Sequence, residues 1–247
     1  MTTLFSKFLE KHLYIVAQPI VDSITKKVYF YEILSRVEID GEIHLPSDFI
    51  PDMNIQMKYR LAKFLFKNIS KLQQLLPDKS FSLNISSLEI DMGIEEYLKK
   101  LLEAEGSFLD ASRCIIEITE HSSLDDEKTY ESIKNIKHNF GFRFALDDFG
   151  SKYSTLDKIY STENVFDYIK VDGALVKNIE TDLMKQVNLQ FMVNFIQTNN
   201  KKVIVEYVSS EEVYKTIMHV SKPEYLQGFY FGEPKSIKCF FKEETAS

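Results

Sequence analysis

The chain has 247 residues, of which 44% are hydrophobic and 27% are charged, and its formal net charge is -7. This is the composition of a folded globular protein, which excludes a disordered chain, and the length suits one domain the size of a β/α barrel. The acidic balance argues against binding to duplex nucleic acid or an anionic membrane, because excess lysine and arginine hold such partners. A phosphate substrate is not excluded, since divalent cations bound by carboxylates reverse the local charge of an acidic pocket.

Targeting and linker signals are absent from the sequence. The N-terminal stretch has no signal-peptide pattern, and no segment approaches the ~20 apolar residues that cross a bilayer, so we expect a cytoplasmic protein without a membrane partner. Cys114 and Cys239 have no C-x-x-C spacing, which predicts neither a disulfide scaffold nor a thiolate metal site. Because no linker or repeat marks a boundary, we expect residues 1–247 to form a single domain.

Eight short runs rich in β-branched and aromatic residues predict strands. In chain order they are 13–20, 27–34, 80–86, 113–119, 142–149, 166–172, 202–208 and 224–231. Apolar residues at helical spacing predict helices at 56–76, 89–104, 125–139, 180–198 and 209–219. Strands that alternate with helices form a parallel sheet, and eight such units close into a barrel without free edges.

The connection between the first two strands breaks this pattern. It consists of about six residues, VDSITK, whereas a parallel crossover needs a dozen or more. We therefore predict an antiparallel hairpin there. The fold class expected is α/β, a TIM-like (β/α)8 barrel with an antiparallel first strand.

Polar and acidic residues gather at the C-terminal ends of the predicted strands, where a β/α barrel carries its chemistry. They are Glu32, Asn84, Glu117, Asp147, Asp148, Lys170, Asp172, Glu206 and Gln227. A single strand-end carboxylate is more often a helix cap or a surface ion pair than a ligand, and Lys170 alone fits a salt bridge equally well. The number of such residues favours a shared site.

Several carboxylates from neighbouring strands repel one another when ionised, so a positive charge is expected among them. Hard cations such as Mg²⁺ or Mn²⁺ prefer oxygen ligands, and an aspartate shared by two of them holds the ions ~3.5–4 Å apart. The five histidines show no zinc-binding spacing. The sequence therefore predicts a site for two divalent metal ions, Mg²⁺ or Mn²⁺.

From about Tyr14 to Pro234 the chain resembles the EAL-domain cyclic di-GMP phosphodiesterases of bacteria. The matching stretches are QPIVD at 18–22, EILSR at 32–36, LNIS at 83–86, EITE at 117–120, LDDFGSKYSTL at 146–156, IKVDG at 169–173, VIVEYV at 203–208 and QGFYFGEP at 227–234. Each stretch alone is weak, but their order and spacing are specific. The resemblance implies a barrel with a reversed first strand and hydrolysis of cyclic di-GMP to linear pGpG by a two-metal mechanism.

The resemblance also assigns roles to the strand-end residues. Ligands of one metal are implied at Glu32, Asn84, Glu117 and Asp147, and those around the second metal at Asp147, Asp148 and Glu206. Whether Glu206 binds its metal directly or through water stays open. Lys170 corresponds to a lysine that contacts the attacking water, and Gln227 to a glutamine beside the nucleotide.

Two further residues have implied or inferred roles. The planar guanidinium of Arg36 can grip a phosphate oxygen, although a salt bridge at the rim is the alternative. Residues 147–160 resemble a loop that links metal binding to a dimer interface, and Glu120 matches the glutamate that steadies this loop. A homodimer is expected on this analogy.

The sequence departs from the family pattern at several positions. Ile33 replaces an alanine, Lys152 and Tyr207 replace glycines, and Ser209 replaces a glutamate. These departures leave open an alternative function, in which a weak or inactive domain binds cyclic di-GMP or a protein partner as a regulator. An unrelated metal-dependent barrel, such as a carbon-carbon lyase, is a second alternative that does not account for the ordered motifs.

Overall fold

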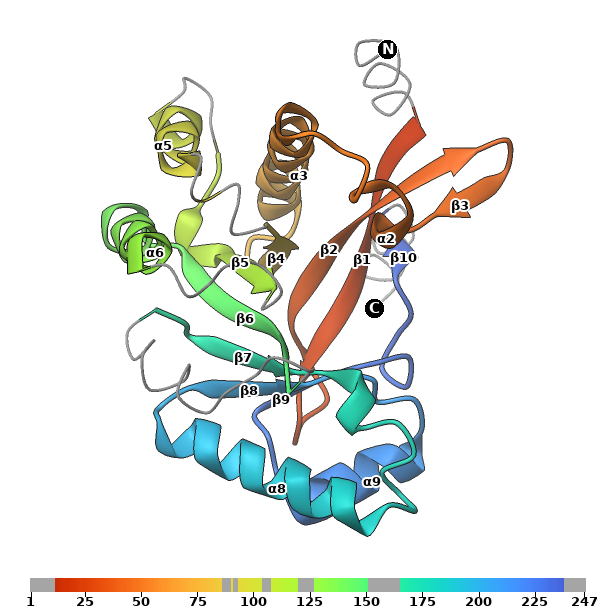
Figure 1. Cartoon of the computed structure of the whole chain (residues 1–247). Coiled ribbons are helices and arrows are strands. Elements are labelled where there is room, and N and C mark those ends of the chain that lie inside the picture. Colours follow the sequence, from red (N-terminus) through yellow and green to blue (C-terminus); the bar gives the residue numbers. More distant parts are fainter. Residues whose placement is uncertain are drawn as a thin grey trace.

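The computed structural model describes residues 12–85, 90, 93–103, 108–119, 127–150 and 165–237. Within these residues eight strands pair into a closed barrel, in the order β1-β9-β8-β7-β6-β5-β4-β2 and back to β1 (Figure 1). The barrel strands are β1 (Leu13–Asp22), β2 (Val28–Ile39), β4 (Ser80–Asn84), β5 (Cys114–Thr119), β6 (Arg143–Phe149), β7 (Tyr168–Val171), β8 (Lys202–Val205) and β9 (Tyr225–Gln227). The predicted α/β barrel is confirmed.

The first strand runs against both of its neighbours. β1 pairs antiparallel with β2 and with β9, whereas the other neighbouring barrel strands pair parallel. The turn between β1 and β2 is closed by Asp22, whose Oδ1 accepts hydrogen bonds from the backbone N–H of Thr25 at 2.7 Å and from its hydroxyl at 2.9 Å. Such an Asx turn needs no helix, so the hairpin predicted from the short connection is confirmed.

Two short strands extend the sheet beyond the barrel. β3 (Glu42–His44) continues β2 as a second hairpin, and β10 (Lys235–Ser236) pairs with β1. Figure 1 shows the hairpin of β2 and β3 projecting to one side of the barrel, with the short helix at 46–49 beside it. These two short strands were not predicted from the sequence.

The helices lie outside the barrel (Figure 1). They are α2 (Pro46–Phe49), α3 (Ile55–Leu75), α5 (Ile94–Glu103), α6 (Glu127–Phe140), α8 (Leu183–Thr198) and α9 (Glu211–Val220). The five predicted helices are present, and α2 was not predicted. None of the helices in the described ranges is long and apolar enough to span a membrane.

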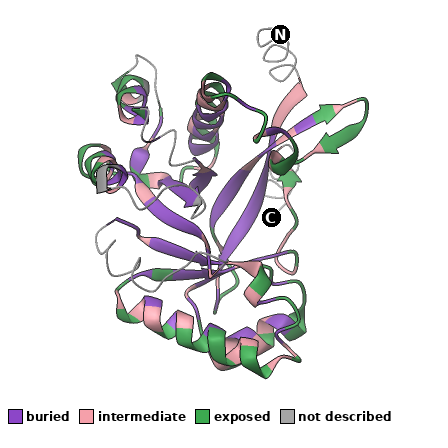
Figure 2. Cartoon of the chain, in the orientation of Figure 1, coloured by how far each residue is buried: buried purple, intermediate pink, exposed green. Residues whose placement is uncertain are grey.

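Two apolar clusters stabilise this arrangement. The larger one fills the space between the strands and the helices, where α3 buries Leu61, Leu65 and Ile69 at helical spacing. Figure 2 shows buried strands flanked by helices whose outer faces are exposed. The smaller cluster consists of Ile20, Phe30, Ile115, Ala145, Tyr168, Ile204 and Tyr225. It comes from seven of the eight barrel strands, as expected for a layer of side chains inside the barrel.

Candidate active site

A polar layer lies next to this small apolar cluster, toward the C-terminal ends of the parallel strands. Side chains on a strand alternate between its two faces, so a residue two positions beyond an interior one points into the barrel as well. The apolar and polar members of each strand are Phe30 and Glu32, Ile115 and Glu117, Ala145 and Asp147, Tyr168 and Lys170, Ile204 and Glu206, and Tyr225 and Gln227. In the reversed β1 the order is inverted, with Gln18 before Ile20. One periodic rule therefore places polar groups from separate strands in one layer.

Lys170 lies at the centre of the polar layer. Its Nζ is 2.6 Å from Oε2 of Glu117, 3.0 Å from Oε1 of Glu206, 3.1 Å from Oδ1 of Asp147 and 3.6 Å from Oε2 of Glu32. The Lys170 side chain is only 2% exposed. One cation therefore faces four carboxylates in a buried space, and it neutralises only part of their charge.

Two side-chain amides hold Glu32 in place. Nδ2 of Asn84 donates to Oε1 of Glu32 at 2.8 Å, and Nε2 of Gln227 donates to Oε2 at 2.6 Å. The same Nε2 lies 3.3 Å from Oε1 of Gln18, whose own Nε2 donates to the carbonyl of Gly232. Because both amide nitrogens point at Glu32, the amide oxygens of Asn84 and Gln227 stay available to other donors or to a cation.

Asp147 and Asp148 lie at an irregularity of β6. The pairing of β6 with β7 shifts register between Leu146 and Phe149, and Asp148 adopts a φ of +59°. A bulge of this kind turns consecutive side chains away from their regular alternation. Each of Asp147, Asp148 and Glu206 thereby offers a carboxylate oxygen, and these oxygens lie within 4.8 Å of one another.

Burial and charge shift the acidities within the cluster. Burial raises the pKa of Glu117 well above its ordinary value, and the neighbouring charge of Glu32 adds to this effect. Burial likewise raises the pKa of Glu206 to about 8. For Glu32, burial is outweighed by the charge of Lys170 and by the two amide donors, so its pKa is lowered. The pKa of Lys170 is raised despite burial, because carboxylates surround it.

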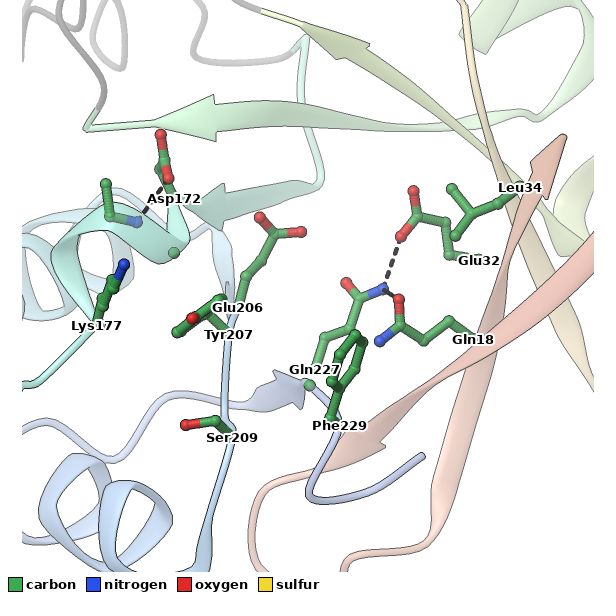
Figure 3. A pocket seen from close by; sticks show the side chains of 13 residues that line it. Gln18, Glu32, Leu34, Asp172, Lys177, Glu206, Tyr207, Ser209, Gln227 and Phe229 are labelled. Carbon is green, nitrogen blue, oxygen red and sulfur yellow. Dashed lines mark hydrogen bonds between the residues drawn. The ribbon is translucent and has the colours of Figure 1, made fainter. Parts of the chain in front are cut away.

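A pocket of about 580 Å³ opens above the cluster (Figure 3). Its lining includes Gln18, Glu32, Leu34, Asp172, Gly173, Ala174, Lys177, Glu206, Tyr207, Ser209, Gln227, Gly228 and Phe229. The volume lies within the range of small-molecule sites. The lining combines carboxylates with aromatic side chains, so the pocket offers both polar and apolar contacts.

The structure brings together eight of the nine predicted strand-end residues, and the ninth, Asp172, has a different role. Asp172 is an N-cap, since its Oδ1 accepts from the N–H of Ala174 at 2.7 Å, although it also lines the pocket. Arg36 shares a strand face with Glu32 and Leu34, but its Nη1 donates to the carbonyl of Ser35 at 2.8 Å. Glu120 lies outside the described residues, as do residues 151–164 of the predicted loop.

The departures from the family pattern fall in different places. Ile33 is 1% exposed and packs in the cluster between strands and helices, on the face of β2 opposite to Glu32. Tyr207 and Ser209 line the pocket, and Tyr207 has a φ of +62°, a conformation that favours glycine. Lys152 lies outside the described residues.

The pocket-lining residues that were not predicted from the sequence include Gln18, Lys177 and Phe229. Gln18 carries a usable signal, because it is a polar residue within an otherwise apolar strand. Lys177 and Phe229 carry none, since an exposed lysine in a turn and an aromatic residue after a strand are common. Only the structure shows that these two residues line the pocket.

A family model and curated relatives match most of this chain. The family model described as EAL domain matches residues 2–234. A curated relative, the probable cyclic di-GMP phosphodiesterase PdeA of Escherichia coli K12, is 28% identical over 216 residues, which cover 83% of this chain. The chain spans 28% of the length of that relative.

Solved structures show the same fold. An EAL domain protein from Listeria monocytogenes superposes with a TM-score of 0.84 at 24% identity, covering all of this chain and 98% of that one. The Bacillus subtilis protein YkuI, solved in complex with c-di-GMP and calcium, gives a TM-score of 0.77 at 21% identity, covering 99% of this chain and 62% of that one.

Proposed function

The chain belongs to the EAL domain family, and on that basis we propose that it is a metal-dependent phosphodiesterase that hydrolyses cyclic di-GMP to linear pGpG. The observation that carries the proposal is the convergence of Glu32, Glu117, Asp147 and Glu206 around Lys170. Relatives named as cyclic di-GMP phosphodiesterases support the substrate.

The donor set fits divalent metal ions. Oε1 of Glu117 and Oε1 of Gln227 are buried without a hydrogen-bond partner among the described residues, which is costly unless a cation or water satisfies them. We assign Glu32, Asn84, Glu117 and Asp147 to one ion, and Asp147, Asp148 and Glu206 to the surroundings of a second. All donors are oxygens, as Mg²⁺ and Mn²⁺ prefer. When bound, such ions supply Lewis acidity and neutralise charge that develops on the phosphate.

The chain's own residues supply orientation and charge. Lys170 stands within 3.6 Å of four carboxylates, so its ammonium group is held in one place and can direct a water molecule toward the phosphorus. Gln227 fixes Glu32 through a 2.6 Å hydrogen bond and borders the pocket, so it can contact the nucleotide as well. Burial of the cluster excludes bulk water and strengthens these interactions.

Arg36 is the proposed anchor for the phosphate that is not cleaved. It lies four residues beyond Glu32 on the same face of β2, roughly 13 Å away at ~3.3 Å per residue. Among the described residues, one nitrogen of its guanidinium donates to the carbonyl of Ser35, and the group carries further donors that can bind an anion. Burial lowers the pKa of Arg36, but a guanidinium stays charged in proteins.

Product analysis tests the proposal. The purified chain with Mg²⁺ or Mn²⁺ should convert cyclic di-GMP to pGpG, as resolved by nucleotide chromatography, and Ca²⁺ should inhibit the conversion. Tight binding of the nucleotide without product under any of these metals would instead favour a binding domain. One observation favours this second function. Tyr207 and Ser209 line the pocket at positions where the family pattern has other residues.

Dimerisation is part of the proposal. α8 exposes an apolar stripe made of Leu183, Met184, Val187 and Phe191, each more than half exposed. The segment after Asp148 starts against this helix, because a Cβ added at Gly150 would lie 2.7 Å from Cε of Met192. A second copy of the chain that covers the stripe would thus border the metal site. Light scattering should show a dimer for the native chain and a monomer for V187E.

A further inference from the structure

Tyr207 has a strained main chain at the edge of the pocket. Its φ is +62°, a value that is a genuine outlier for a bulky residue, because Cβ then crowds the neighbouring carbonyl. Strain of this kind persists only where the surrounding structure imposes it, and it gathers at functional sites.

Hydrogen bonds on both sides of Tyr207 impose the conformation. The N–H of Glu206 donates to the carbonyl of Val171 at 3.3 Å, and the N–H of Val208 donates to the carbonyl of Gln227 at 3.0 Å. The flanking residues are thus tied to β7 and to the end of β9. Tyr207 is thus held between two residues that are themselves bonded to neighbouring strands.

The ring of Tyr207 is supported but not buried. A Cβ added at Gly173 would lie 2.7 Å from Cβ and 3.2 Å from Cγ of Tyr207, so the ring rests against the glycine backbone. The residue is nevertheless 49% exposed, and it belongs to neither apolar cluster. Core packing therefore does not account for a large side chain at this strained position.

The exposed part of the ring borders the pocket. Tyr207 follows Glu206 directly and lines the same cavity as Glu32 and Lys177 (Figure 3). If a phosphodiester is bound at the carboxylate cluster, the groups attached to its phosphate therefore lie next to this ring. Aromatic side chains bind flat heterocycles by stacking, largely independently of which base is present.

We propose that Tyr207 is a substrate-binding residue whose ring stacks on a base of the nucleotide held at the carboxylate cluster. This assignment rests on the proposed function, because it takes a nucleotide phosphodiester as the ligand. Gly173 supports the ring from behind, and the left-handed backbone aims it at the cavity.

Calorimetric titration with cyclic di-GMP in the presence of Ca²⁺ tests the proposal without turnover. Asparagine tolerates a positive φ, so Y207N removes the ring while keeping the backbone conformation. We expect Y207N to bind about 10-fold more weakly than the native chain and Y207F to restore the affinity, as for loss of one stacked base. Equal affinity of Y207N and the native chain would overturn the role of Tyr207.

Lys222 offers a matched control for backbone strain. It also has a positive φ, of 51°, and it does not line the pocket. Both Y207N and K222N should raise the melting temperature, because each relieves a left-handed residue, but only Y207N should weaken nucleotide binding. A similar loss of affinity in K222N would assign the effect to strain and would overturn stacking.

A spectroscopic test is available because the chain contains no tryptophan. In Y207W the single indole should be quenched on addition of cyclic di-GMP with Ca²⁺. The control is Y29W, at the opposite end of the barrel, where Tyr29 stacks on Tyr225 at 4.4 Å. Quenching that is equal in both variants, or absent from Y207W although the nucleotide binds, would overturn the proposal. Failure of the native chain to bind cyclic di-GMP would instead overturn the proposed substrate, and the assignment of Tyr207 with it.

Discussion

The ammonium group of Lys170 lies 2.6 Å from Oε2 of Glu117, and neither side chain is more than 2% exposed. A buried ion pair is costly to break, because the remaining partner keeps its charge without compensation. Here Lys170 also faces three further carboxylates. The polar layer of the barrel therefore depends on this lysine for stability as well as for the proposed chemistry.

We predict that K170M destabilises the metal-free chain. The loss in unfolding free energy should be about 3–5 kcal/mol, the usual result of removing one partner of a buried pair, and turnover should disappear. Urea unfolding in EDTA measures the first effect. K215M is the control, since Lys215 pairs with Glu211 on the surface, where both side chains are more than 60% exposed, and its removal should change stability little. Equal stability of K170M and K215M would contradict the prediction.

Replacement of Glu32 should abolish activity without unfolding the chain. E32Q keeps the shape of the side chain but removes the charge of a proposed metal ligand, so pGpG formation should fall about 100-fold or more, beyond the usual effect of losing a residue that only hydrogen-bonds a ligand. E38Q, on an exposed position of the same strand, should retain activity. Circular dichroism of both variants should match the native chain. An unfolded E32Q would mean that Glu32 serves structure, and the site assignment would weaken.

The metal-free chain should lose stability as the pH rises. The folded chain keeps a proton on Glu206 up to about pH 8, whereas an unfolded glutamate releases it near 4.5. The folded state thus binds more protons between these values, so the unfolding free energy falls with rising pH in that window. Melting temperatures in EDTA, from about pH 5.5 to 8.5, should decline more steeply for the native chain than for E206Q. Parallel curves would show that Glu206 does not titrate in this way.

Gly228 should not tolerate a side chain. A Cβ there would lie 2.2 Å from the carbonyl oxygen of Val208 and 2.3 Å from its nitrogen, and φ is +159°. We expect G228A to unfold at a clearly lower temperature and to lose nucleotide binding, because the backbone beside Gln227 must shift. G41A is the matched control, since Gly41 also has a positive φ but nothing lies within 4 Å of its added Cβ. Equal melting temperatures would argue against a steric role.

The layered interior explains how much of the site was predictable. Alternation along a strand is fixed by backbone geometry, so Glu32, Glu117 and Lys170 could be assigned to one layer once the strands were located. The bulge at Asp148 could not be predicted, because it depends on how β6 and β7 adjust their register in the closed barrel. Gln18 was missed because the reversal of β1 inverts its place relative to Ile20.

Element boundaries show the same limit. β2 continues to Ile39, beyond the predicted end, because residues 35–37 pair with residues 13–15 of β1 and residues 37–39 pair with β3, a partner that is invisible in the local pattern. β9 ends at Gln227, well before the predicted end, because the chain turns at Gly228 and the N–H of Phe231 donates back to its carbonyl. The length of β2 was thus decided by pairing with other strands and the end of β9 by a turn at Gly228, while the local sequence of each segment remained compatible with a longer or shorter strand.

The reversal of β1 also decides from which side the polypeptide enters the barrel. Leu13 pairs with Val37, near the end of β2, whereas Asp22 pairs with Tyr225, at the start of β9. The upstream end of β1 thus faces the rim of the cavity, and an all-parallel barrel would have put it at the opposite end. A regulatory module or an affinity tag joined upstream of Leu13 would be tethered on the same side of the barrel as the pocket that Glu32 and Glu206 line.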